Sequence, residues 1–163
     1  MATLTEQAAA LLELCRRKKL RIAAAESCTG GLIAATLTEI PGSSDVVERG
    51  FVTYSNDAKQ AMLGVPASTI EKFGAVSRET AEAMAAGALK NSPAELAVSV
   101  TGIAGPGGAT PGKPVGLVHF AAASSRGSLI HREKRFGDIG RSQVRHASVI
   151  EALDMLRVLA EAQ

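Results

Sequence analysis

Hydrophobic residues recur at helical spacing near both ends of the chain. Between residues 4 and 18 apolar positions lie three or four apart, and a second such stripe, with Val149, Leu153 and Leu156, runs through residues 141–160. Both patterns predict amphipathic helices. Shorter helices are predicted over residues 30–40, 56–63 and 77–89.

Short runs of apolar and β-branched residues predict β-strands between these helices, over residues 21–25, 46–54, 96–100, 115–123 and 128–136. The last two flank Ser124-Ser125-Arg126-Gly127 and are typical of a hairpin. Helices alternate with strands up to residue 100, which favours parallel pairing with helices on both faces. We therefore expect an α/β fold: three-layer α/β/α with a mixed, mostly parallel sheet of about five strands.

Composition narrows the class of protein. The chain has 163 residues, 46% of them hydrophobic and 21% charged, which favours one globular domain over residues 1–163. Aromatic residues make up 3% and the net charge is +2 without a basic face, which argues against nucleic-acid binding. Cys15 and Cys28, the lack of a secretory leader and the lack of a long apolar run predict a cytoplasmic protein with reduced thiols and no membrane segment.

A glycine-rich turn carries the first candidate for chemistry, Ser27. It lies where a predicted strand ends and a helix begins, the edge at which open α/β sheets bind ligands. Backbone N–H groups at a helix start favour an anion, such as a phosphate or a developing oxyanion. Gly30 and Gly31 would let a ligand approach the backbone closely. The alternative is that Ser27 or Thr29 only caps the helix.

A serine nucleophile needs a base, and the histidines are poorly placed for this role. His119 and His131 lie within predicted hairpin strands and His146 within the last helix, with no accompanying triad pattern.

Lys59 is the other candidate base, because it follows the second strand and should leave a parallel sheet at the edge that holds Ser27. A neutral lysine can accept the serine proton if its pKa of about 10.4 is lowered by burial or by cationic neighbours. A hydrogen bond from Tyr54 could orient the amine. Lys59 could also be a surface lysine, and Cys28 is a rival nucleophile because thiolates are activated near helix N-termini.

Two further features could bind an anion. The loop Thr101-Gly102-Ile103-Ala104-Gly105-Pro106-Gly107-Gly108 follows a predicted strand and offers a backbone nest. It leads into a segment that imitates a P-loop, but Pro114 stands where such a loop needs serine or threonine. Arg141 and Arg145, four apart on one helix, could clamp a phosphate or be solvated. No metal-binding motif is evident, so hydrolysis would depend on a side-chain nucleophile or base.

Taken together and in order, several motifs resemble the CinA C-terminal domain family, the nicotinamide-nucleotide amidases. They are Glu26-Ser27-Cys28-Thr29-Gly30-Gly31, Tyr54-Ser55-Asn56 with Lys59, the 101–108 loop, and Lys113-Pro114-Val115-Gly116. The resemblance covers nearly the whole chain. It implies a three-layer α/β/α fold and cofactor-free hydrolysis of nicotinamide mononucleotide to nicotinic acid mononucleotide and ammonia, in pyridine-nucleotide salvage.

The same resemblance implies residue roles. Ser27 would be the nucleophile, Lys59 its base and Tyr54 an orienting partner. The substrate would be bound by Thr29, Gly30, Gly31, Thr101, Gly102, Gly105 and Arg141. Gly137-Asp138 stands two residues further from Arg141 than the family pattern has it, so Arg145 stays open as the phosphate ligand. Many members carry an N-terminal domain that this chain lacks, so we expect a free-standing domain.

Other functions use the same loops. A regulatory module could bind a pyridine nucleotide without turnover, although it would not need the Ser–Lys–Tyr set. A role in DNA uptake or recombination is suggested only by the family's competence-linked name. The expected partner is a small-molecule nucleotide, with no nucleic acid and no membrane, and the chain could form a homodimer or higher homo-oligomer through its Ala-rich helix.

Overall fold

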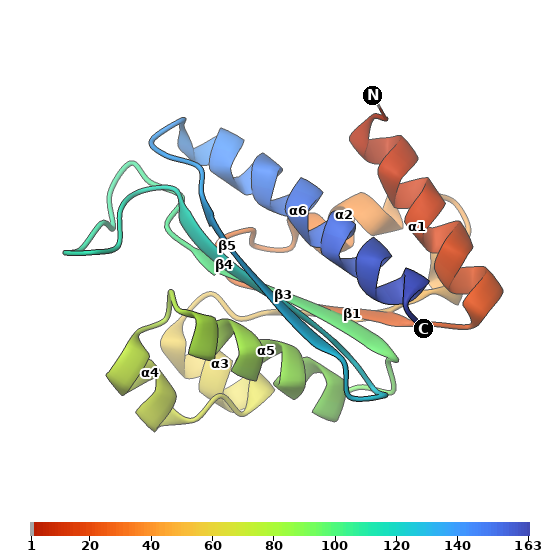
Figure 1. The fold of residues 1–163 in the computed structure, drawn as a ribbon, viewed down its shortest axis with the longest axis horizontal. Helices are drawn as coiled ribbons and strands as arrows, with labels where there is room; N and C mark the ends of the chain where they lie inside the picture. Colours follow the sequence, from red (N-terminus) through yellow and green to blue (C-terminus); the bar gives the residue numbers. More distant parts are fainter. Residues whose placement is uncertain (1) are drawn as a thin grey trace.

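A five-stranded sheet with the strand order β2-β1-β3-β4-β5 forms the middle of the molecule (Figure 1). The computed structural model describes residues 2–163. The strands are β1 (Ile22–Glu26), β2 (Val47–Val52), β3 (Leu96–Gly102), β4 (Leu117–Ser124) and β5 (Leu129–Arg135). β1 pairs in parallel with both β2 and β3, whereas β4 runs antiparallel to β3 and β5. This topology confirms the mixed sheet and the hairpin.

Helices cover both faces of the sheet (Figure 1). They are α1 (Leu4–Lys18), α2 (Leu32–Thr38), α3 (Asn56–Leu63), α4 (Ala67–Phe73), α5 (Arg78–Lys90) and α6 (Arg141–Glu161). α1, α2 and α6 lie on one face, and α3, α4 and α5 lie on the other. The three-layer α/β/α prediction is therefore confirmed.

One helix escaped the sequence prediction. α3 ends at Leu63, as predicted, but Pro66 then serves as the N-cap of the seven-residue α4. Ile70 is the buried residue of α4. A single apolar contact point leaves no periodicity from which so short a helix can be predicted.

Small side chains let the interior strand β1 carry helices on both sides. Ala23, Ala24 and Ala25 of β1 are all buried, with Ala24 in the cluster beneath α1, α2 and α6 and the other two facing α5. Alanine is a weak strand former. A strand covered on both faces nevertheless consists of a continuous run of apolar residues. The alanines of β1 therefore reflect close packing rather than intrinsic preference.

Gly87 in α5 allows α3 to pack closely. A Cβ at this position would overlap the carbonyl group of Leu63, the last residue of α3. Although alanine favours helices, we expect Gly87→Ala to lower the free energy of unfolding by about 1–3 kcal/mol, because the two helices must separate. Urea denaturation measures this change. Gly107→Ala is the control, because its Cβ would meet no atom within 4 Å, and an equal loss in both variants would contradict the prediction.

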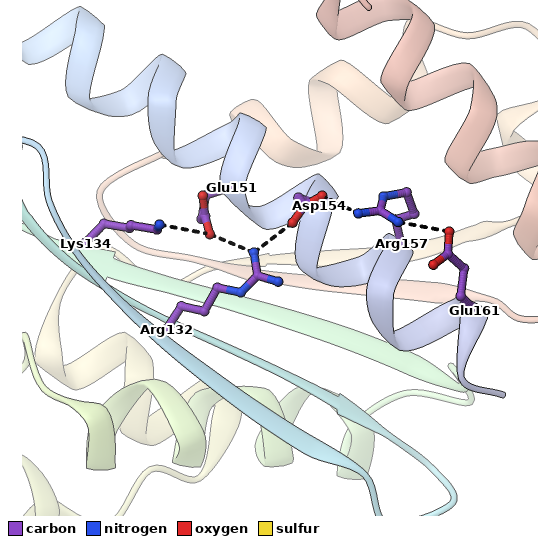
Figure 2. A network of polar contacts seen from close by, with 6 residues as sticks. All are labelled: Arg132, Lys134, Glu151, Asp154, Arg157 and Glu161. Atoms are coloured by element: carbon purple, nitrogen blue, oxygen red, sulfur yellow. Dashed lines mark hydrogen bonds and ion pairs between the residues drawn. The ribbon is translucent and has the colours of Figure 1, made fainter.

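Charged residues tie α6 to the edge strand β5. Figure 2 shows the alternating network of Lys134, Glu151, Arg132, Asp154, Arg157 and Glu161. The Arg132 guanidinium lies 2.8 Å from carboxylate oxygens of both Glu151 and Asp154, and its hydrogen bond lowers the pKa of Asp154. Exposed ion pairs contribute about 0–1 kcal/mol each, so the network adds little to stability while it links α6 to β5. The first turns of this helix carry Arg141 and Arg145.

Candidate active site

The carboxyl ends of the parallel strands meet at one edge of the sheet. Glu26, the last residue of β1, is aligned with Val52 of β2 and Val100 of β3. Ser27 therefore lies level with Thr53 and Thr101, and a cleft of about 300 Å³ opens beside them. Its lining includes these predicted residues: Ser27, Tyr54, Lys59, Thr101, Gly102, Gly105 and Arg141.

Lys59 lies beside Ser27 at this edge. α3 begins directly after β2, where the Ser55 hydroxyl accepts a hydrogen bond from the Ala58 amide at 3.0 Å and caps the helix. The first turn of α3 directs Lys59 back into the sheet edge, where its Nζ lies 3.1 Å from Ser27 Oγ. The lysine is 1% exposed, and burial lowers the pKa of its amine below the usual 10.5.

Main-chain carbonyl oxygens complete the surroundings of the amine. Lys59 Nζ donates hydrogen bonds to the carbonyl oxygens of Thr53 at 3.0 Å and Tyr54 at 3.3 Å. Tyr54 therefore contacts the amine through its backbone and not through its ring, which differs from the expected side-chain contact. Such carbonyl contacts have no signature in a sequence, because every residue carries the same group.

The Tyr54 ring and Arg141 meet at the mouth of the cleft. Arg141 donates through Nη2 to the Tyr54 hydroxyl at 3.1 Å and through Nη1 to the carbonyl of Gly105 at 2.8 Å. Tyr54 is 63% exposed, so its hydroxyl lies at the surface. The guanidinium thus joins the glycine-rich loop to the segment after β2, two segments far apart in sequence.

Arg145 forms hydrogen bonds with the backbone of the glycine-rich turn. Its Nε and Nη2 donate to the carbonyl oxygens of Cys28 and Thr29, both at 3.1 Å. Of the two arginines considered, Arg141 lines the cleft and Arg145 does not. Arg141 is therefore the arginine that can reach a molecule in the cleft.

The start of α2 already holds an anion from the protein itself. The Glu26 carboxylate accepts hydrogen bonds from the amides of Ile33 and Ala34 at 2.8 and 3.0 Å. The substrate-binding role expected for this helix start meets a physical obstacle, because its amides point at Glu26. Thr29, Gly30 and Gly31 lie in the turn but are not among the residues that line the cleft.

Thr101 lies in the cleft wall with its side chain engaged. Its hydroxyl donates to the carbonyl oxygen of Ala75 at 2.8 Å, and the residue is 1% exposed. Thr101 thereby connects β3 to the segment between α4 and α5. Ala75 and Val76, which carried no signal in the sequence, also line the cleft. They follow α4, the helix that the pattern did not reveal.

Cys28, the rival nucleophile, is buried next to Ser27. Burial raises the pKa of its thiol to about 11, against the opposing influence of Arg145 and Lys59. A thiol with this pKa is protonated at neutral pH and is a weak nucleophile. The electrostatics of the turn therefore favour Ser27.

The histidines lie outside the cleft lining. His119 of β4 and His131 of β5 face each other, with Nδ1 of the former 3.0 Å from Nε2 of the latter. Glu133 lies 3.6 Å from His119, and Arg78 and Glu82 of α5 face His131. Burial lowers the pKa of both imidazoles below 6.5. The pair is neutral in the fold at pH values where an unfolded histidine is charged.

This histidine pair predicts acid sensitivity of the fold. Because both folded-state pKa values lie below that of an unfolded histidine, the unfolded chain binds more protons, and stability falls as the pH drops below about 6.5. We expect His131→Gln to reduce the loss in Tm between about pH 7.5 and about pH 5.5. The exposed His146→Gln serves as the control. Equal losses in His131→Gln and the unaltered protein would contradict the prediction.

Within residues 2–163 there is no group of three or more His, Cys, Asp or Glu side chains that could hold a metal ion. The same part of the chain contains no helix with the length and apolarity needed to cross a membrane.

The fold and the cleft define an α/β domain with a buried serine–lysine pair at the carboxyl edge of its parallel strands. Comparison with known families identifies the family of this domain. The family model of the CinA C-terminal domain matches residues 4–160, and the chain belongs to this family.

Known relatives agree with this assignment. A CinA-like protein of Mycolicibacterium vanbaalenii is 54% identical over 136 residues, which is 83% of this chain and 32% of the relative. The crystal structure of a competence/damage inducible protein from Agrobacterium tumefaciens is 55% identical with a TM-score of 0.94, covering 98% of this chain and 99% of that one. A CinA superfamily protein from Klebsiella pneumoniae is 30% identical with a TM-score of 0.94, covering 99% of this chain and 100% of that one. This chain spans about a third of the length of the curated relatives it matches.

Proposed function

We propose that this domain is an amidohydrolase that converts nicotinamide mononucleotide to nicotinic acid mononucleotide and ammonia through a Ser–Lys mechanism. The observation that carries the proposal is the hydrogen bonding of the buried Lys59 amine, which has Ser27 Oγ at 3.1 Å and two backbone carbonyl oxygens around it. The choice of substrate rests on the family resemblance and on the basic group at the cleft mouth.

The number of hydrogen-bond acceptors around the Lys59 amine determines whether it can accept a proton from Ser27. A neutral amine has two hydrogen atoms and one lone pair. The carbonyl oxygens of Thr53 and Tyr54 can only accept, so they take the two hydrogen atoms. The lone pair is then left for the hydroxyl proton of Ser27. Because burial lowers the pKa of Lys59, the neutral form that this geometry needs is accessible at lower pH than for a solvated lysine.

The reaction follows from this pairing. Lys59 takes the hydroxyl proton while Ser27 Oγ attacks the carboxamide carbon and the C=O electron pair moves to oxygen. When the tetrahedral intermediate collapses, the C–N bond breaks and the Lys59 ammonium returns a proton to the leaving nitrogen, which departs as ammonia. Water, deprotonated by Lys59, then attacks the ester carbon. When this second intermediate collapses, the bond to Ser27 Oγ breaks, the Lys59 ammonium returns its proton to Ser27 Oγ, and nicotinic acid mononucleotide is released.

Two parts of the cleft would hold the charges of the substrate. The oxyanion forms next to Ser27, where we assign the amides of Cys28, Ala104 or Gly105 as donors because these residues line the cleft. Arg141 would bind the phosphate, for which its planar guanidinium provides paired donors. Glu26 already occupies the α2 amides. That occupancy supports placing the phosphate at Arg141.

Incubation with nicotinamide mononucleotide tests the proposal. We expect stoichiometric release of ammonia and of nicotinic acid mononucleotide, measured by an ammonia-coupled assay and by mass spectrometry. Nicotinamide riboside, which lacks the phosphate, should be a poorer substrate through a higher KM. Binding of the mononucleotide without ammonia release would reject the enzyme and favour a nucleotide-binding module.

A further inference from the structure

A buried carboxylate lies directly before the candidate nucleophile. Glu26 is 1% exposed, and both of its oxygens accept hydrogen bonds from first-turn amides of α2: Oε1 from Ile33 at 2.8 Å and Oε2 from Ala34 at 3.0 Å. The N-cap of α2 is Gly31, which has no side chain to perform this function. A negative charge at a helix N-terminus is favoured by the helix dipole. Glu26 therefore caps α2 from the end of β1.

The segment enclosed by this contact contains Ser27. Its amide donates to the Val100 carbonyl of β3 and its carbonyl accepts from the Gly30 amide, both at 3.0 Å. Gly30 and Gly31 follow with φ of 60° and 109°, values open to glycine but strained for other residues. Two successive glycines give the turn freedom to take other shapes. The Glu26 carboxylate restricts the turn, because it connects the start of α2 to the end of β1.

A cation holds the same turn from another element. Arg145 of α6 donates to the carbonyl oxygens of Cys28 and Thr29, while Glu26 accepts from the amides that follow. The turn is thus held at its carbonyl groups by Arg145, and the helix that follows it is held at its first-turn amides by Glu26.

We propose that Glu26 is a positioning residue, whose carboxylate holds the glycine-rich turn so that Ser27 Oγ stays within reach of Lys59 Nζ. Glu26 is not among the residues that line the cleft, so it acts through the turn and not on the substrate. Two acceptor oxygens are required, because the two amides both donate. Glutamine has the same shape but offers one acceptor and one NH₂ group, which would oppose an amide N–H.

The first experiment compares Glu26→Gln with Glu39→Gln. Glu39 is an exposed glutamate at the other end of α2, which makes its variant a control for the loss of one charge near this helix. For nicotinamide mononucleotide we expect Glu26→Gln to lower kcat by about 10²-fold with little change in KM, because misplacing a reacting group costs rate rather than binding. A folded Glu26→Gln protein with unaltered kcat, or one that changes only KM, overturns the proposal.

The ammonia assay rests on the proposed function. Two further measurements do not. The first is the rate at which a fluorophosphonate probe labels Ser27, followed by mass spectrometry, which should fall by a similar factor in Glu26→Gln alone. If the unaltered protein releases no ammonia, the proposed function fails while the labelling rates still decide the role of Glu26. Equal labelling rates in Glu26→Gln and Glu39→Gln overturn the proposal.

Amide hydrogen exchange of the unaltered protein covers the case in which Glu26→Gln does not fold. Ser142 and Gln143 occupy the same first-turn positions in α6, whose N-cap Gly140 has no side-chain cap. We expect Ile33 and Ala34 to exchange at least about tenfold more slowly than these two residues, since hydrogen-bonded amides are protected. Equally fast exchange at both helix starts overturns the proposal without any substitution.

Discussion

Replacing Ser27 by alanine is expected to lower ammonia release from nicotinamide mononucleotide by at least about 10³-fold, because the covalent route is lost with the nucleophile. Circular dichroism and Tm should stay close to those of the unaltered protein, since alanine fits wherever serine does. The measurement is kcat/KM from the ammonia assay, together with loss of probe labelling at residue 27.

Ser125→Ala is the matched control, because Ser125 lies exposed in the hairpin turn between β4 and β5. It should keep full activity. Full activity in a folded Ser27→Ala protein would contradict the assignment and direct attention to Cys28. In that case Cys28→Ala would have to abolish activity, although burial raises the pKa of this thiol to about 11.

Replacing Lys59 by methionine is expected to have a comparable effect on rate. Methionine fills a similar volume but cannot accept the Ser27 proton, so kcat/KM should fall by at least about 10³-fold. Volume-conserving replacements in a packed interior usually cost less than about 1.5 kcal/mol, so the protein should remain folded. Lys113→Met is the control: its amine lies outside the cleft lining, on the carbonyl of Phe73.

The pH profile of the unaltered enzyme tests the role of Lys59 independently. Its folded-state pKa lies below the usual 10.5 because of burial, so the neutral base is lost as the pH falls through that lowered value. We expect kcat/KM to decrease toward acid with the loss of one deprotonated group. An activity that rises toward acid, or a Lys59→Met enzyme that keeps the rate and profile of the unaltered protein, would contradict the mechanism.

Element order was predictable because each element has its own local pattern. The apolar stripe in α6 and the hairpin turn at 124–127 are short-range signals, and the structure confirms both elements. α4 was missed because a seven-residue helix with one buried position has no measurable period. β1 was a weak prediction because its alanines reflect packing between two helix layers, which is a tertiary property.

The cleft was predictable in part for the same reason. Ser27 stands at a strand-to-helix turn and Lys59 shortly after a parallel strand, so their placement at one edge follows from topology. It was not predictable that Glu26 would accept hydrogen bonds from the α2 amides, because this contact depends on how β1 and α2 pack together. The choice between Arg141 and Arg145 also required coordinates, since the two side chains leave the same helix and reach different segments.

Apart from α4, the sequence by itself determined the order of the main helices and strands, the α/β class and the turn that carries Ser27, because periodicity, caps and glycines act over a few residues. Only the tertiary structure decided that Lys59 is buried with its amine between Ser27 and two backbone carbonyls. Strand register and helix packing bring those atoms together over a separation of up to 32 residues. Carbonyl groups are common to all residues, so the sequence does not mark which of them will surround an amine.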